Sequence, residues 1–211
     1  MSESVFKPSF FEREDETPDE LFYREPRLLV HIDESAIEAA ERLYAEVLPK
    51  NAALLDLMSS YRSHLPPELA WTRLAGLGMN GIELSENDQL TEYAVKDINA
   101  DPALPYGDAE FGGAVVTVSI QYLTQPLAVF REIARVLRPG APFVVTYSNR
   151  MFPTKAIRIW RALAVIERAG LIGAYFKHSG CFGDVIAQDR SIEDGSLHDP
   201  LFAVWALKLP G

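Results

Sequence analysis

Clusters of polar side chains stand directly after short apolar runs at several points of the chain. The densest cluster, at 56–64, holds a carboxylate, three serine hydroxyls, an arginine and a histidine. The others lie at 78–84, 97–99, 118–123 and 148–152. Such side chains bind ligands by accepting and donating hydrogen bonds. Ligands in open α/β sheets bind beyond the carboxyl ends of the strands. The clusters therefore predict one shared ligand site.

Histidine, serine and cysteine chemistry offers few alternatives to a binding site. His64 is a possible general base, although a lone histidine is more often structural. Ser59 and Ser60 lack the surrounding G-x-S-x-G sequence of a hydrolase nucleophile. The other histidines share no spacing typical of metal ligands. The single cysteine, Cys181, excludes an internal disulfide and a multi-cysteine metal site, so we expect no metal.

The elements that must position these clusters are clearest over residues 104–149. A β-branched run at 115–120 predicts a buried strand. Pro126 then opens a helix whose apolar residues recur at helical spacing, and an Arg-Pro-Gly turn at 138–140 ends it. A second buried strand follows at 143–147. Strand, helix, turn and strand form a βαβ unit, so the two strands are expected to be parallel neighbours.

The same alternation continues on both sides of that unit. We expect strands at 52–57, 71–77 and 92–98, helices at 35–48, 66–70, 84–90 and 155–169, and two final strands at 182–188 and 201–209. Alternation of strands and helices implies a mostly parallel sheet covered on both faces. The last two strands can pair as a hairpin, which makes one strand antiparallel. The predicted fold class is α/β, a three-layer sandwich.

Composition sets the broad class of the protein. With 211 residues, 48% of them hydrophobic, the chain suits one domain, which we assign to 21–211. Residues 1–20 are polar and acidic, which predicts a flexible N-terminal arm. A net charge of −10 without a basic stripe argues against nucleic-acid binding. No apolar run is long enough to span a bilayer, so we expect a cytoplasmic protein without membrane contact.

Three motifs resemble those of a known family. They are LPYGDAEF at 104–111, VSIQYL at 118–123 and FREIARVLRPG at 130–140. They look like the later motifs of class I S-adenosylmethionine-dependent methyltransferases, especially the small bacterial type 11-like members. The resemblance implies a Rossmann-like sheet of seven strands, mostly parallel with an antiparallel strand from the C-terminal hairpin. It also implies S-adenosylmethionine as the cofactor.

The resemblance singles out the loop after the first predicted strand. In the family a glycine-rich loop follows an acidic residue there. This chain has the acid, Asp56, but Met58, Ser60 and Arg62 stand in place of the three glycines. The result is a serine-rich version of the loop. Either its hydroxyls bind the cofactor where other members use bare backbone, or cofactor binding has been lost.

Two further strand ends match family positions. Asn80, or Glu83 close by, stands where an acid usually holds the ribose hydroxyls, and Asn80 is equally suited to a turn. Asp97 matches the acid beside the adenine amino group, with Ile98 supplying an amide, unless Asp97 only caps a turn. The implied cofactor-binding residues are Asp56, Met58, Ser59, Ser60, Tyr61, Asn80, Glu83, Asp97, Ile98 and Ser119.

The implied reaction is methyl transfer to a small-molecule substrate by in-line attack. Such a reaction needs alignment and exclusion of water more than an acid–base pair. His64, Tyr122 and Arg150 are the candidate positioning residues. Arg27, Arg62 or Arg150 is suited to hold a carboxylate or phosphate of the substrate. We expect a monomer or a homodimer.

Two other functions remain as alternatives. A non-catalytic, methyltransferase-like binding protein is favoured by the missing glycines and by Gly112, which stands where the family usually has aspartate. A nicotinamide-dependent oxidoreductase would carry G-x-G-x-x-G after the first strand, and that motif is absent.

Overall fold

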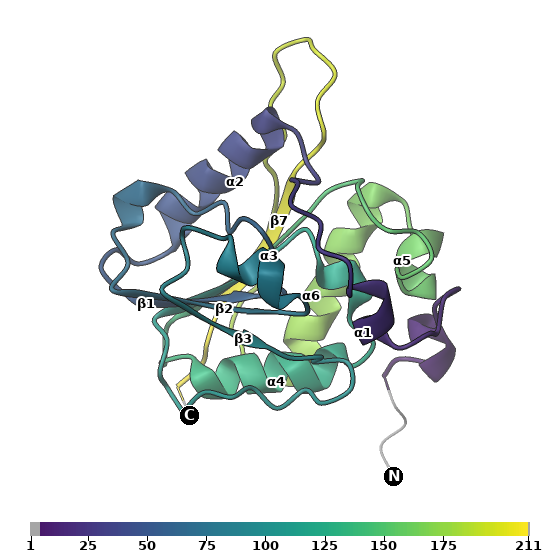
Figure 1. The fold of residues 1–211 in the computed structure, drawn as a ribbon, viewed down its shortest axis with the longest axis horizontal. Helices are drawn as coiled ribbons and strands as arrows, with labels where there is room; N and C mark the ends of the chain where they lie inside the picture. Colours follow the sequence, from purple (N-terminus) through teal and green to yellow (C-terminus); the bar gives the residue numbers. More distant parts are fainter. Residues whose placement is uncertain (1–4, 211) are drawn as a thin grey trace.

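The computed structural model describes residues 5–210, and its centre is one seven-stranded sheet (Figure 1). The strands are β1 (Ala53–Leu57), β2 (Arg73–Gly78), β3 (Glu92–Val95), β4 (Gly113–Thr117), β5 (Pro142–Tyr147), β6 (Ile186–Asp189) and β7 (Phe202–Leu207). Their order across the sheet is β3-β2-β1-β4-β5-β7-β6, and β7 is antiparallel to both of its neighbours. The other pairings are parallel. The predicted fold, including the C-terminal hairpin, is confirmed.

Helices cover both faces of the sheet. On one face, α4 (Pro126–Val136) and α6 (Arg168–Ser179) bury their apolar residues against alternate residues of β1, β4 and β5. On the other face, α2 (Glu34–Val47) packs against the remaining residues of those strands. Asp33 caps α2, since its Oδ1 accepts a hydrogen bond from the Ala36 amide at 2.9 Å. The three-layer architecture follows from these two apolar helix faces.

The single long helix expected at 155–169 is wrong. The chain instead forms α5 (Arg158–Ala162), a short 3-10 turn at Val165–Glu167 and then α6, which continues through Gly170. The Arg168 guanidinium stabilises this corner, because it lies 5.0 Å from the Trp160 ring centroid and donates to the Trp160 carbonyl. The helix stop is Gly180, whose φ of +73° suits the left-handed conformation that ends helices.

The helix expected at 84–90 is also misplaced. The structure has α3 (Gly81–Ser85), which begins directly after β2. Asn80 determines this start, since its Oδ1 accepts hydrogen bonds from the amides of Ile82 and Glu83. The helix after β2 is therefore shorter than the predicted helix at 84–90 and begins earlier in the sequence.

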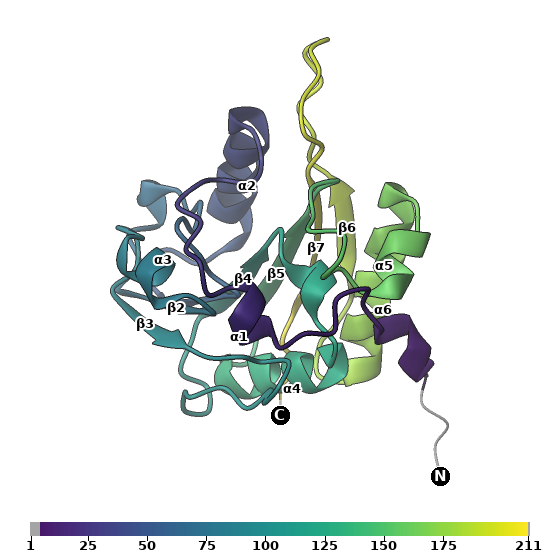
Figure 2. The same ribbon diagram turned by 45° about the vertical axis from the view of Figure 1, so that its right-hand side comes forward.

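The N-terminal segment crosses the carboxyl ends of the strands (Figure 2). It contains a 3-10 turn at Pro8–Phe11 and the one-turn helix α1 (Asp19–Phe22). Lys155, whose side chain is 0% exposed, lies beneath it and donates to the Thr17 carbonyl at 2.6 Å. Its Nζ also lies 3.2 Å from Asp19 Oδ1. These contacts place residues of the predicted arm directly over the carboxyl ends of the strands.

Candidate functional site

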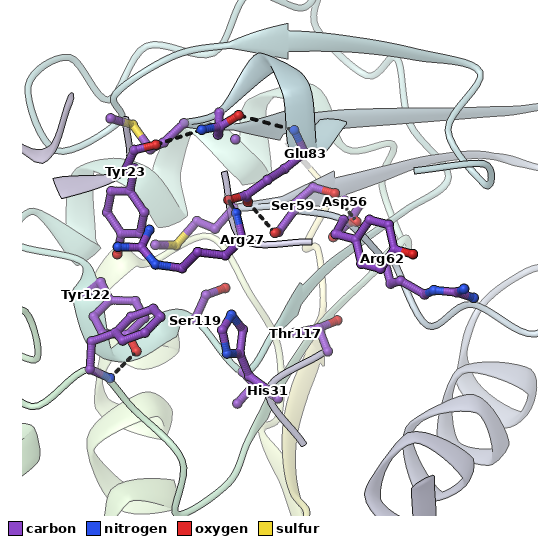
Figure 3. Close-up of a pocket in the computed structure, with 18 of the residues that line it drawn as sticks. Tyr23, Arg27, His31, Asp56, Ser59, Arg62, Glu83, Thr117, Ser119 and Tyr122 are labelled. Atoms are coloured by element: carbon purple, nitrogen blue, oxygen red, sulfur yellow. Dashed lines mark hydrogen bonds between the residues drawn. The ribbon is translucent and has the colours of Figure 1, made fainter. Parts of the chain in front are cut away.

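A cavity of about 330 Å³ opens at the carboxyl ends of β1 to β4 (Figure 3). β1 pairs with β2 on one side and with β4 on the other, so the strand order reverses there. Such reversal points are where open α/β sheets bind ligands. All five predicted clusters contribute lining residues, as does the N-terminal segment. The five clusters therefore meet at one cavity.

The loop after β1 makes its turn without glycine. Met58 takes a left-handed backbone with φ of +57°, the conformation that glycine adopts most easily. The Ser59 amide then donates to the Leu77 carbonyl at 2.9 Å, which fixes the loop against β2. A Cβ atom added at Gly78 would lie 2.1 Å from the Ser59 carbonyl oxygen. The glycine that permits close approach is thus on the neighbouring strand, in Gly-x-Gly at 76–78.

Asp56 is buried at the base of this loop. Its Oδ2 accepts a hydrogen bond of 2.5 Å from Ser59 Oγ. Burial raises the pKa of Asp56 to about 7, and hydrogen bonds from Ser59 and Ser63 oppose that rise. The carboxyl group therefore exchanges a proton near neutral pH.

Asn80 and Glu83 are both engaged by neighbouring groups. Besides capping α3, Asn80 donates from Nδ2 to the carbonyls of Tyr23 at 2.8 Å and Arg24 at 3.0 Å. Glu83 accepts from the Arg27 amide at 2.7 Å and from Ser60 Oγ at 2.5 Å. These two side chains join the end of β2 to the N-terminal segment.

Two substitutions at Asn80 separate the cap from the contact with the N-terminal segment. We expect Asn80→Ala to lower the free energy of unfolding by about 2 kcal/mol, because it removes a helix cap and two further hydrogen bonds. Asn80→Ser keeps an acceptor for the cap and loses the donated bonds without adding a charge, so about half that loss is expected. Urea denaturation of both variants tests this. Equal losses would contradict the separation of the two roles.

The turn after β3 supplies an unused acceptor to the cavity. Asp97 Oδ1 accepts from the amides of Asn99 at 2.8 Å and Ala100 at 3.1 Å, as in a turn cap. Its Oδ2 accepts no hydrogen bond from residues 5–210, and Ile98 lines the cavity beside it. Asn99, which sequence reasoning gave no role, bonds to Asp19 Oδ2 and to the Tyr122 carbonyl. No local pattern signals those distant partners.

The loops after β4 and β5 form the opposite wall. Val118 has φ of +52°, an outlier for a β-branched residue, and such strain clusters at functional sites. The Oγ of Ser119 is buried and has no hydrogen-bond partner among the described residues. Tyr122 Oη accepts from the Phe152 amide at 2.7 Å, which joins the two loops. Arg150 is exposed and its Nε lies 2.8 Å from Asp199 Oδ1.

The cavity contains two neutral histidines. Burial, with a smaller effect from Arg62, lowers the pKa of His64 to about 4. Burial also lowers the pKa of His31, a residue that sequence reasoning did not select. Both imidazoles are therefore uncharged at pH 7 and can accept a hydrogen bond. Among residues 5–210 no group of three potential ligands is arranged to hold a metal ion. No helix in that range is long and apolar enough to cross a membrane.

Comparison with known proteins places the fold. A family model described as a methyltransferase domain matches residues 75–145. No curated protein matches the chain in sequence. A SAM-dependent methyltransferase from Aquifex aeolicus superposes with a TM-score of 0.58 at 15% identity, covering 97% of this chain and 100% of that one. An S-adenosylmethionine-dependent methyltransferase from Mesorhizobium loti superposes with a TM-score of 0.57 at 16% identity, covering 83% of this chain and 99% of that one.

A third similar chain comes from a complex that contains the Haloferax volcanii Trm112 methyltransferase activator. It superposes with a TM-score of 0.60 at 12% identity, covering 83% of this chain and 91% of that one. These likenesses show the fold, and the family match spans β2 to β5 of the sheet. The chain therefore has the fold of S-adenosylmethionine-dependent methyltransferases, and its residues 75–145 match the methyltransferase domain model.

Proposed function

We propose that the chain binds S-adenosylmethionine and transfers its methyl group to a small molecule. The cavity carries this proposal, because it gathers the ends of four strands into one space of about 330 Å³. The N-terminal segment lies over that space and favours a substrate small enough to enter a covered site. The match of residues 75–145 to the methyltransferase domain model supports the cofactor.

The residues present fit this cofactor in three places. Asp97 Oδ2 is an unused acceptor suited to the adenine amino group. Ser119 offers a buried hydroxyl that no described residue satisfies. Gly78 allows the loop after β1 to lie against β2. Asp97 and Ile98 would hold the adenine, Glu83 the ribose, and the loop that begins at Asp56 the methionine part.

When bound, S-adenosylmethionine supplies a methyl group on a sulfonium that is already a good leaving group. The chain's own residues then contribute positioning and a dry cavity. The bond from the Phe152 amide to Tyr122 Oη fixes two loops that face the substrate. His64 is neutral, so it can accept a hydrogen bond from a hydroxyl group of the substrate that receives the methyl group.

Calorimetric titration with S-adenosylhomocysteine tests the cofactor site. We expect binding by the wild type and an affinity about 5- to 150-fold lower for Asp97→Asn, which corresponds to 1–3 kcal/mol for a lost buried acceptor. Asparagine keeps the Oδ1 that caps the turn, so folding is expected to be unchanged. Asp108→Asn is the matched control, because Asp108 is an exposed acid paired with Arg135, and neither residue lines the cavity. Absence of heat with the wild type would contradict the proposal.

One observation favours the alternative of a non-catalytic binding protein. Both carboxylate oxygens of Glu83 already accept hydrogen bonds within the chain, one from the Arg27 amide. The hydroxyl groups of a bound ribose must therefore share the Glu83 carboxylate with the Arg27 amide and Ser60 Oγ, or displace them. An isotope assay for methyl transfer to candidate acceptors, run on protein that binds S-adenosylhomocysteine, distinguishes the two functions.

A further inference from the structure

Three arginines were candidates for holding an anionic group, and the structure separates them. Arg150 is paired with Asp199 and its side chain is 60% exposed. Arg62 is exposed, and its guanidinium lies 5.4 Å from the Tyr61 ring centroid. Arg27 has no carboxylate within ion-pair distance in the described part of the chain. Its Nη1 is buried and makes no hydrogen bond to any described residue.

The Arg27 guanidinium is held in place by aromatic rings. Its central carbon lies 4.7 Å from the Phe22 ring centroid, 5.8 Å from that of Tyr23 and 5.2 Å from that of Phe152. Nη2 donates to the Phe22 carbonyl at 2.9 Å. Figure 3 shows the side chain extending toward the Tyr23 ring within the cavity. Cation–π contacts thus fix the group without neutralising its charge.

The surroundings of this guanidinium indicate what it recognises. The Phe152 ring stacks with Tyr122 at 5.9 Å and meets the His31 ring edge to face at 5.2 Å. This part of the cavity is therefore lined by aromatic rings and holds one donor that no described residue satisfies. A fixed guanidinium matches a carboxylate in shape and charge. Aromatic walls favour a flat, unsaturated body next to that carboxylate.

We propose that the methyl acceptor is an aromatic carboxylic acid whose carboxylate binds Arg27. This inference rests on the proposed function and specifies its substrate class. The methionine carboxylate of the cofactor is the other possible source of the anion. The substrate is the better fit, because Arg27 lies against Phe22, Tyr23 and Phe152, whereas the methionine part is expected at the loop after β1.

Matched pairs of acids and amides test the proposal directly. Benzoate, 4-hydroxybenzoate and phenylacetate, each beside its neutral amide, are titrated into protein with and without saturating S-adenosylhomocysteine. We expect the acids to bind at least about tenfold more tightly than the amides, as a charge-assisted hydrogen bond allows. Arg27→Gln should remove that preference. Arg42→Gln, which removes an exposed arginine paired with Glu38 on α2, should keep it.

The outcomes separate this inference from the proposed function. Equal affinity for acids and amides, or a preference that survives in Arg27→Gln, would overturn the assignment of Arg27. If Arg27→Gln weakens S-adenosylhomocysteine tenfold and leaves methylthioadenosine unchanged, the carboxylate is the cofactor's and the substrate assignment is wrong. If the wild type does not bind S-adenosylhomocysteine, the proposed function fails, while the titrations without it still measure the preference for acids.

Discussion

Asp56→Asn is expected to raise the free energy of unfolding by about 4 kcal/mol at pH 8 and by about 2 kcal/mol at pH 5. The carboxyl group is 2% exposed, and burial raises its pKa from 3.8 to about 7. At pH 5 the group is therefore mostly protonated in the folded protein but mostly ionised in the unfolded chain, so part of the stability is already lost there. At pH 8 the wild type must keep a buried carboxylate, which the variant does not contain.

The direction follows from proton linkage. A group whose pKa is higher in the folded state binds more protons in that state between pH 4 and pH 7. Its contribution to stability is present below the unfolded pKa and is lost as the pH rises through about 7. The histidines and surface carboxylates titrate in both proteins, so the difference between wild type and variant isolates Asp56. Urea denaturation at pH 5, 6, 7 and 8 measures it, and a difference independent of pH would contradict the prediction.

The same substitution should act against ligand binding. A cationic ligand group favours the ionised form of Asp56, so binding of S-adenosylmethionine is expected to release protons near pH 7. Calorimetry in two buffers with different ionisation enthalpies detects that release. Asp56→Asn should abolish it and weaken binding by about 1.5–3 kcal/mol, the range for hydrogen bonds to charged groups. A variant that is more stable but binds the ligand more weakly would show that the buried Asp56 carboxylate lowers stability for the sake of binding.

Much of the fold was predictable because local patterns agree with the tertiary structure. The unit at 104–149 combines a β-branched run, an apolar repeat at helical spacing and a second buried run after a Pro-Gly turn, and these three segments appear as β4, α4 and β5. The two final strands lack a helix between them, which predicted the antiparallel pair. The lining of the cavity was predictable for a related reason, since the carboxyl ends of parallel strands meet at one edge of the sheet.

What could not be predicted depends on contacts between distant residues. The break before α6 depends on Arg168 against Trp160, a pair that no periodicity reveals. The left-handed backbone at Met58 and Val118 runs against the preference of both residue types. Asn99 and Lys155 look like surface residues in the sequence, yet both bond to the N-terminal segment. The hydrogen bonds of Asn80 and Glu83 to residues 23–27 likewise join segments far apart in the sequence.

Lys155→Met is expected to lower the free energy of unfolding by about 3 kcal/mol, the lower end of the range for breaking a buried ion pair. In the variant the Thr17 carbonyl loses its hydrogen-bond donor. Asp19, which is 5% exposed, loses the positive charge of Lys155 beside it. Arg13 and Asn99 still bond to Asp19, which keeps the loss from being larger. Lys208→Met is the matched control, because Lys208 donates to the Leu137 carbonyl and has no ion-pair partner in residues 5–210. About 1 kcal/mol is expected there.

A double-mutant cycle identifies the charge pair as the cause. Asp19→Asn alone leaves Lys155 buried beside only Asp15, so it should also destabilise the protein. The double variant Lys155→Met with Asp19→Asn removes both charges, and its loss is expected to fall short of the sum by about 1–3 kcal/mol. Additive losses would show that Lys155 acts through its bond to Thr17 and through packing, not through the charge of Asp19. Because Lys155 holds the segment that covers the cavity, its loss should also speed proteolysis at Arg13 and Arg24 and hasten dissociation of S-adenosylhomocysteine, whereas Lys208→Met should leave both rates unchanged.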